Sequence, residues 1–177
     1  MQEEQNTFQE EQCSIVGHSQ VANILRRMNE EMRTNKRFNG YIDQLQFLIS
    51  NRENSDLKGL GEKLRAVGRE DELQSAERDL LWFEMMLDKL THYQSAQRLF
   101  FYFLSRILNV FETKVMPDTL NLTREEVEQI IEDEIVKPTL AEMDEVGGHD
   151  HLLITPSEVR GMINWLAERC HIRWQSC

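Results

Sequence analysis

Apolar side chains recur at alternating steps of four and three residues along one long stretch of the chain, Glu77 to Val115. This spacing places them on one line of an α-helix. The line runs through Phe83, Leu87, Leu90, Phe101, Leu104, Leu108, Phe111 and Val115. A second apolar line lies beside it and runs through Trp82, Met86, Tyr93, Ala96, Phe100, Phe103, Ile107 and Val110. A helix that is apolar over so much of its circumference is surrounded by neighbours, so the pattern predicts a central helix across Leu80–Phe111.

Two amides interrupt the first apolar line at its middle, Gln94 and Gln97. A buried amide needs hydrogen-bond partners, and leaving it unpaired costs about 1–3 kcal/mol. These residues therefore mark a kink, a break or a contact point in the predicted central helix.

Shorter amphipathic segments flank the central stretch. One helix is predicted from Ser19 and a second after the bend at Asn39-Gly40, while a third is closed by Gly68. Prolines at 117 and 138 predict helix ends before them. With no β-branched stretch of alternating polarity, the chain is predicted to be all-α: a single helical bundle around one long central helix, with short capping helices at the C-terminus.

Two helix starts carry a capping box, in which a threonine and a glutamate three residues later pair with each other's backbone N–H groups. The first joins Thr123 to Glu126, and the second joins Thr155 to Glu158 with Pro156 at the first helical position. Residues 1–16 are rich in glutamine and glutamate, which predicts a flexible acidic tail or a docking arm. Residues 17–177 are predicted to form one helical domain.

The charge of the chain bears on its partners. The formal net charge of −11 disfavours non-specific binding to nucleic acid, which depends on neutralising phosphates. One region is basic, and it comprises Arg26, Arg27, Arg33, Lys36 and Arg37. It is either a solvated face or a local patch for DNA phosphates or an acidic partner, so we expect DNA contact only through a complex or through this patch.

Candidate catalytic and metal-binding residues do not match a known pattern. Glu128 and Glu132 share a helix face, but no Glu-x-x-His pair accompanies them as a di-iron bundle needs. Five residues near the C-terminus have zinc-ligating side chains without a familiar spacing, namely His149, His151, Cys170, His171 and Cys177. The sequence also lacks nucleophile signatures and phosphate-binding glycine loops. We therefore expect no catalytic activity, no metal and no cofactor.

The N-terminus and the cysteines indicate the compartment. The polar start of the chain does not resemble a signal peptide, and the longest apolar stretch, Leu99 to Leu104, is too short to span a membrane. Three cysteines do not indicate a disulfide framework. These features predict a cytoplasmic protein that does not associate with membranes.

The C-terminal stretch carries a more specific signal. Gly161-Met162, followed by Cys170-His171-Ile172-Arg173-Trp174, resembles the ending of helical domains in bacterial ABC-three-component systems, which more often have lysine at the position of Arg173. The resemblance extends upstream through Leu64, Gly68-Arg69, Ser95-Ala96-Gln97 and Phe111 with Pro117, so that it spans roughly Leu57 to Trp174.

The resemblance implies a role as well as a family. Such domains often follow an effector, commonly a nuclease, and work beside an SMC-like ATPase. Residues 1–56 are expected to be too short and too helical for a nuclease domain, so the chain is similar to the small stand-alone subunit of a Lamassu-type complex that acts against phage and plasmids. This implies a non-catalytic adaptor that binds the ATPase and helps to position or restrain the effector.

Three C-terminal side chains are the first candidates for partner binding. Trp174 follows the last periodic residue, close to His171 and Arg173, and tryptophan and arginine are favoured in interfaces. Trp174 is equally suited to close the end of the bundle as a lid. The basic residues 26–37 are the second candidate. A free-standing antitoxin-like regulator and a metal-dependent helical hydrolase remain as alternative functions.

Overall fold

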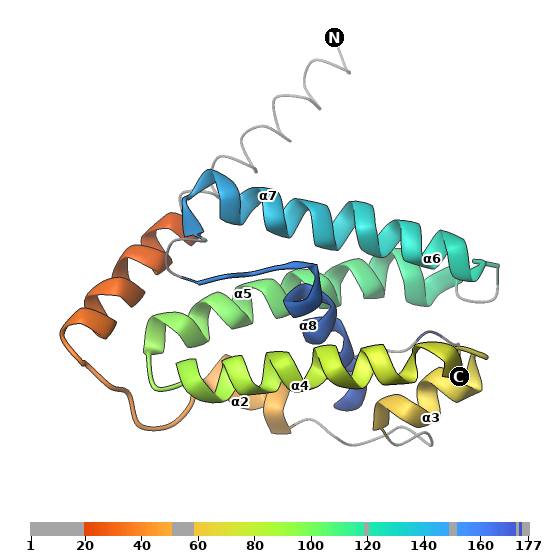
Figure 1. Ribbon diagram of the computed structural model, residues 1–177, viewed down its shortest axis with the longest axis horizontal. Helices are drawn as coiled ribbons and strands as arrows, with labels where there is room; N and C mark the ends of the chain where they lie inside the picture. The colour runs from red at the N-terminus through yellow and green to blue at the C-terminus, as the bar shows by residue number, and fades with distance from the viewer. Residues whose placement is uncertain (1–19, 51–58, 119–120, 149–151, 173, 175–177) are drawn as a thin grey trace, which may run out of the picture.

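The computed structural model describes residues 20–50, 59–118, 121–148, 152–172 and 174 (Figure 1). Every regular element within these ranges is helical, which confirms the predicted all-α class. The predicted acidic tail, residues 1–16, lies outside the described residues.

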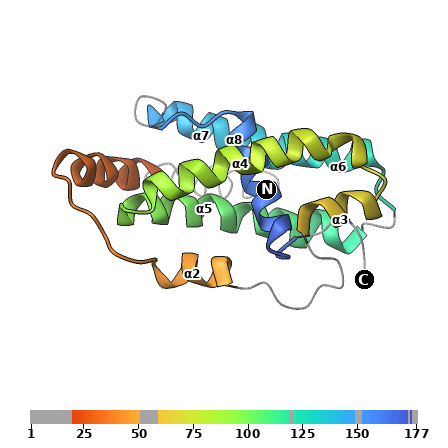
Figure 2. The ribbon, with the colours of Figure 1, turned by 60° about the horizontal axis from the view of Figure 1, so that its bottom comes forward.

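Helices make up most of the described chain. A helix over residues 20–33 comes first. It is followed by α2 (Asp43–Ser50), α3 (Gly59–Ala66), α4 (Leu73–Leu90), α5 (Gln94–Val110), α6 (Arg124–Ile131), α7 (Lys137–Glu145) and α8 (Pro156–Glu168). Figures 1 and 2 show α4 and α5 as an antiparallel pair, and in Figure 1 the α6–α7 run lies along the side of α5 that faces away from α4.

The prediction of one long central helix was wrong, because the stretch divides at Thr91–Tyr93 into α4 and α5. The side chain of Gln97 stabilises the break from a fully buried position. Its Nε2 donates to the carbonyl oxygens of Thr91 at 2.6 Å and Gly40 at 2.7 Å, and its Oε1 accepts from the backbone N–H of Ile42 at 2.6 Å. Of the three roles expected for the amides, Gln97 therefore supports the break.

The start of α5 is capped from another helix. The carboxylate of Glu31 accepts hydrogen bonds from the backbone N–H of Ser95 at 3.0 Å and from its hydroxyl at 3.1 Å. A carboxylate at this position satisfies a free N–H group and interacts favourably with the helix dipole. Glu31 thus fixes the helix over residues 20–33 against the first turn of α5.

Helix α8 packs most extensively on α4, which it crosses in the middle of the molecule (Figure 1). Gly161 lies at the crossing, where an added Cβ would come within 3.0 Å of the backbone oxygen of Asp79 and of the Cβ of Phe83. Next to it, the ring of Phe83 makes edge-to-face contacts with Phe100 of α5 and Trp165 of α8. These three rings join α4, α5 and α8 into one core.

Both predicted capping boxes are present, at Thr123 with Glu126 and at Thr155 with Glu158. The predicted helix end before Pro138 was wrong. A π-helical turn, Glu132–Val136, instead connects α6 to α7 without a gap, and Pro138 lies in the first turn of α7. Such a turn widens the helix locally, which accommodates a ring that would clash with a regular α-helical ladder.

The two apolar lines of the predicted central helix differ in how far they are buried. Residues of the first line are mostly buried, including Phe83, Leu104 and Phe111. The second line is buried in α5, but Trp82 in α4 is 54% exposed, so its predicted burial was wrong. Among the described residues, no helix is both long enough and apolar enough to cross a bilayer.

Candidate protein-binding surfaces

The C-terminal segment from Cys170 packs onto the end of the bundle. Trp174 is only 9% exposed, its ring makes an edge-to-face contact with Phe111, and the guanidinium of Arg69 lies 5.5 Å from its centroid. The segment turns sharply at Cys170, which has a φ of 64°. Trp174 therefore lies where a lid would, and little of its ring remains for a partner.

The rest of this segment ties α8 to earlier helices. His171 Nε2 is 2.7 Å from the carbonyl oxygen of Leu48, and burial lowers the pKa of the imidazole. A neutral ring then donates from Nε2 to this carbonyl. The buried ammonium of Lys63 donates to the carbonyl oxygen of Ala167 and, at 3.5 Å, to that of Ile172. Arg173 lies outside the described residues.

We expect Trp174→Ala to lower the free energy of unfolding by about 3–5 kcal/mol, because it removes a large side chain from a packed site. Denaturation with urea, followed by circular dichroism, measures this change. Trp82→Ala is the matched control, and at its exposed position it should change stability by less than about 0.5 kcal/mol. A Trp174→Ala variant as stable as the control would contradict the lid and return Trp174 to the candidate interface residues.

The predicted basic residues are divided between the first helix, which ends at residue 33, and the segment that follows it. Arg26, Arg27, Arg33, Lys36 and Arg37 are all exposed. Arg26 donates to the side chain of Asn23 at 3.1 Å, and Arg37 donates to that of Asn35 at 3.2 Å. Of the five residues, Arg27 alone lines the large groove described below. The predicted patch is thus divided between a cavity wall and the outer surface.

The acidic helix face forms ion pairs. Arg160 binds Glu128 at 3.0 Å and Glu132 at 3.4 Å, and the buried guanidinium of Arg69 also binds Glu128. Burial alone would raise the pKa of Glu128, but hydrogen bonds from Arg160 and Arg69 outweigh it and lower the pKa. Both carboxylates that suggested a metal site are therefore engaged by arginines.

The described residues contain no cluster of three histidine, cysteine, aspartate or glutamate side chains that could hold a metal ion. Among the zinc candidates, His149, His151 and Cys177 lie outside the described part of the chain. The prediction that the protein binds no metal accordingly stays a prediction.

A strip of exposed apolar side chains lies on the outer face of α4. It consists of Leu81, Trp82 and Met85, which are 58%, 54% and 56% exposed. Residues three and four positions apart are neighbours on a helix surface, so Met85 lies beside both Trp82 and Leu81. Charged residues flank this α4 strip by one turn on either side, namely Glu77, Arg78, Asp88 and Lys89. An apolar centre with a charged rim is typical of a protein-binding surface.

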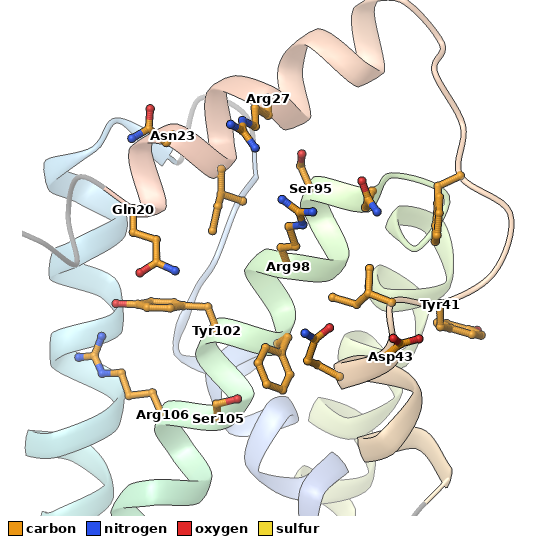
Figure 3. A pocket seen from close by; sticks show the side chains of 16 residues that line it. Gln20, Asn23, Arg27, Tyr41, Asp43, Ser95, Arg98, Tyr102, Ser105 and Arg106 are labelled. Carbon is orange, nitrogen blue, oxygen red and sulfur yellow. The ribbon is translucent and has the colours of Figure 1, made fainter.

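A groove of about 1240 Å³ lies along α5. Its floor is one face of α5, and its walls are the helix over residues 20–33 and the segment from Phe38 to Gln44. Figure 3 shows Arg27 pointing down from the first helix and Arg98 pointing up from α5 toward it.

A buried carboxylate binds two side chains that line this groove. Glu142 on α7 accepts a hydrogen bond from the hydroxyl of Tyr102 at 2.8 Å and binds Arg106 at 2.6 Å. Burial and the bond to Glu142 raise the pKa of Tyr102 to about 12, so its hydroxyl remains a donor at neutral pH. Arg106 is therefore neutralised within the fold, whereas no ion pair joins Arg27 or Arg98 to any residue that the structure describes.

Residues 59–174 match the family model for C-terminal domain 9 (CTD9) of the ABC-three component (ABC-3C) systems. The chain belongs to the CTD9 family. The match covers α3 to α8 and the C-terminal lid, and it confirms the resemblance to ABC-three-component proteins on a similar range of residues. Comparison with curated proteins and with solved structures gave no match.

The two candidate surfaces differ in whether they lie within the CTD9 match. The α4 strip lies wholly within the matched region, whereas the groove combines α5 of the CTD9 domain with residues 20–44, which precede the match. Neither surface was predicted from the sequence. Trp82 was assigned to the core because it continues an apolar line, and the groove depends on contacts between distant segments.

Proposed function

We propose that this protein is a non-catalytic adaptor subunit of a Lamassu-type ABC-3C defence complex. In this role it binds an SMC-like ATPase and helps to position or restrain a nuclease effector. Membership of the CTD9 family supports a place in a multicomponent system. The engaged carboxylates of Glu128 and Glu132 leave protein binding as the function that the described surfaces favour.

The observation that carries the proposal is the α4 strip. Helix α4 buries one face against α8 and leaves Leu81, Trp82 and Met85 in solvent. Large apolar side chains grouped in this way mark interaction sites, and tryptophan is prominent among residues that dominate binding energy. We assign the α4 strip as the surface that contacts the ATPase.

Trp82→Ala should weaken the complex with the ATPase by about 2–4 kcal/mol, or roughly 30- to 1000-fold in affinity, because it removes the largest anchor of the strip. The measurement is co-expression of the chain with the ATPase and effector encoded beside it, followed by pull-down and phage-protection assays. Phe47→Ala is the matched control, since Phe47 is an aromatic residue 62% exposed on α2.

Each outcome of this experiment assigns the surface or the function. Equal recovery of the ATPase with Trp82→Ala and Phe47→Ala would show that the α4 strip is not the contact. Recovery of a nuclease without an ATPase would favour the antitoxin-like regulator. If the wild-type chain recovers neither partner, the adaptor function is wrong.

A further inference from the structure

The groove between the first helix and α5 has the dimensions of a peptide site. Its volume of about 1240 Å³ exceeds the roughly 300–1000 Å³ of typical small-molecule pockets. The residues of α5 that line it run from Gln94 to Arg106 along one face of the helix. At a rise of 1.5 Å per residue this face is about 18 Å long, which matches a helix of about 12 residues.

Two cations in the groove have no counter-ion among the described residues. Neither Arg27 nor Arg98 makes an ion pair or a side-chain hydrogen bond with that part of the chain. Their side chains point toward each other across the groove (Figure 3). Two facing cations repel each other, and a carboxylate placed between them would relieve this repulsion through charge-assisted hydrogen bonds.

The positive charge of Arg27 and Arg98 contrasts with the negative net charge of the chain. The chain carries a net charge of −11, and the nearby carboxylates Glu31 and Glu142 already bind Ser95 and Arg106. Asp43, the acidic residue that lines the groove, lies on another wall, close to Tyr41 (Figure 3). Arg27 and Arg98 therefore form a positive site on an acidic protein.

Apolar side chains accompany the two cations. Ile24 and Phe38 lie in the walls, and the half-buried ring of Phe101 lies in the floor. A partner that fits both features has carboxylates on one side and an apolar anchor on the other, as an acidic amphipathic helix does. Helices bind in this way by laying an apolar face into a groove, with charges fixing their orientation.

We propose that this groove binds an acidic amphipathic helix from a partner protein. Carboxylates of the helix pair with Arg27 and Arg98, and an apolar side chain packs on Phe101. Ile24, Phe38 and Phe101 offer contacts suited to the apolar face of a helix, so the observations favour a peptide over phosphates. This site goes beyond the adaptor contact, because it lies on α5 and the first helix and shares no residue with the α4 strip.

The test uses a fluorescein-labelled peptide of about 12 residues, with glutamates on one helical face and leucine and phenylalanine on the other. Its affinity for the full chain is measured by fluorescence anisotropy. The variant Arg27→Glu/Arg98→Glu reverses the two groove charges. The control Arg26→Glu/Arg33→Glu reverses two exposed charges of the first helix that do not line the groove.

We expect the groove variant to bind the peptide at least tenfold more weakly and the control to bind it within twofold of the wild type. A peptide with lysine in place of glutamate should bind the groove variant better than it binds the wild type, which also shows that the variant is folded. Trp82→Ala should leave peptide binding unchanged, so that failure of this site and failure of the adaptor surface are distinguishable.

Three results would overturn the proposal. The first is failure of the peptide to bind the wild type, and the second is equal binding of the peptide by both charge-reversed variants. In the third case, an oligothymidylate of similar length binds the wild type more tightly than the peptide does and loses affinity in Arg27→Glu/Arg98→Glu. That result would assign the groove to single-stranded nucleic acid instead.

Discussion

Gly161→Val should abolish the cooperative unfolding transition of the isolated chain. A Cβ at this position would come within 3.0 Å of the backbone oxygen of Asp79, which cannot move aside as a flexible side chain can. Helix α8 would have to lift away from α4 and expose the rings of Phe83 and Trp165. Overpacking alone costs about 1–3 kcal/mol, and loss of the surrounding core contacts adds to this.

Thermal denaturation followed by circular dichroism measures the effect of Gly161→Val. Ala141→Val is the matched control, because it introduces the same β-branched residue at an exposed position of α7 and should cost well under 1 kcal/mol. A Gly161→Val protein that melts with the cooperativity and midpoint of the control would show that α8 does not approach α4 this closely.

Leu104→Asp should also prevent folding. Leu104 is fully buried in α5, and a carboxylate there would lose its hydration without gaining a partner, at a cost of several kcal/mol. This loss is comparable to the whole stability of a typical domain, about 5–15 kcal/mol. The measurement is the yield of folded protein together with the far-ultraviolet circular dichroism of the purified chain.

Asn109→Asp is the control for this substitution, because it places the same carboxylate at an exposed position of the same helix. It should fold as the wild type does. Cooperative unfolding of Leu104→Asp with unchanged stability would mean that α5 does not form the core of the molecule.

Local signals in the sequence predicted the fold well where the structure depends on neighbouring residues. The capping boxes at Thr123 and Thr155 each involve residues three positions apart, so the sequence alone contains both partners. The apolar line through Phe83, Leu104 and Phe111 was predicted for the same reason, since helical periodicity determines which side chains share a face.

The break between α4 and α5 could be anticipated only in part. Gln97, a polar residue on an apolar line, indicated the position of the break. The hydrogen-bond partners of Gln97 at Gly40 and Ile42, however, are more than 50 positions away in the chain. The residues at the break include neither glycine nor proline. A chain reversal that depends on such distant hydrogen bonds leaves no local pattern.

Local sequence patterns did not predict the binding surfaces either. Trp82 and Phe83 are adjacent in an apolar helix, but α8 covers only the face that carries Phe83. Periodicity identifies an apolar face without indicating whether this chain or another protein covers it. Trp174 illustrates the converse, because a tryptophan beyond the last helical period is buried by Phe111 and Arg69, which lie far away in sequence.

The hydrogen bonds of Gln97 and Glu31 have a consequence for the boundary of the domain. The family match begins at residue 59, but the first turn of α5 and the reversal before it depend on residues 31, 40 and 42. A fragment cut at the start of the match would leave the buried amide of Gln97 with two of its three partners missing. The unit that folds therefore extends beyond the unit that is shared with the family, and a chimaera that transplants CTD9 would need residues 20–50 as well.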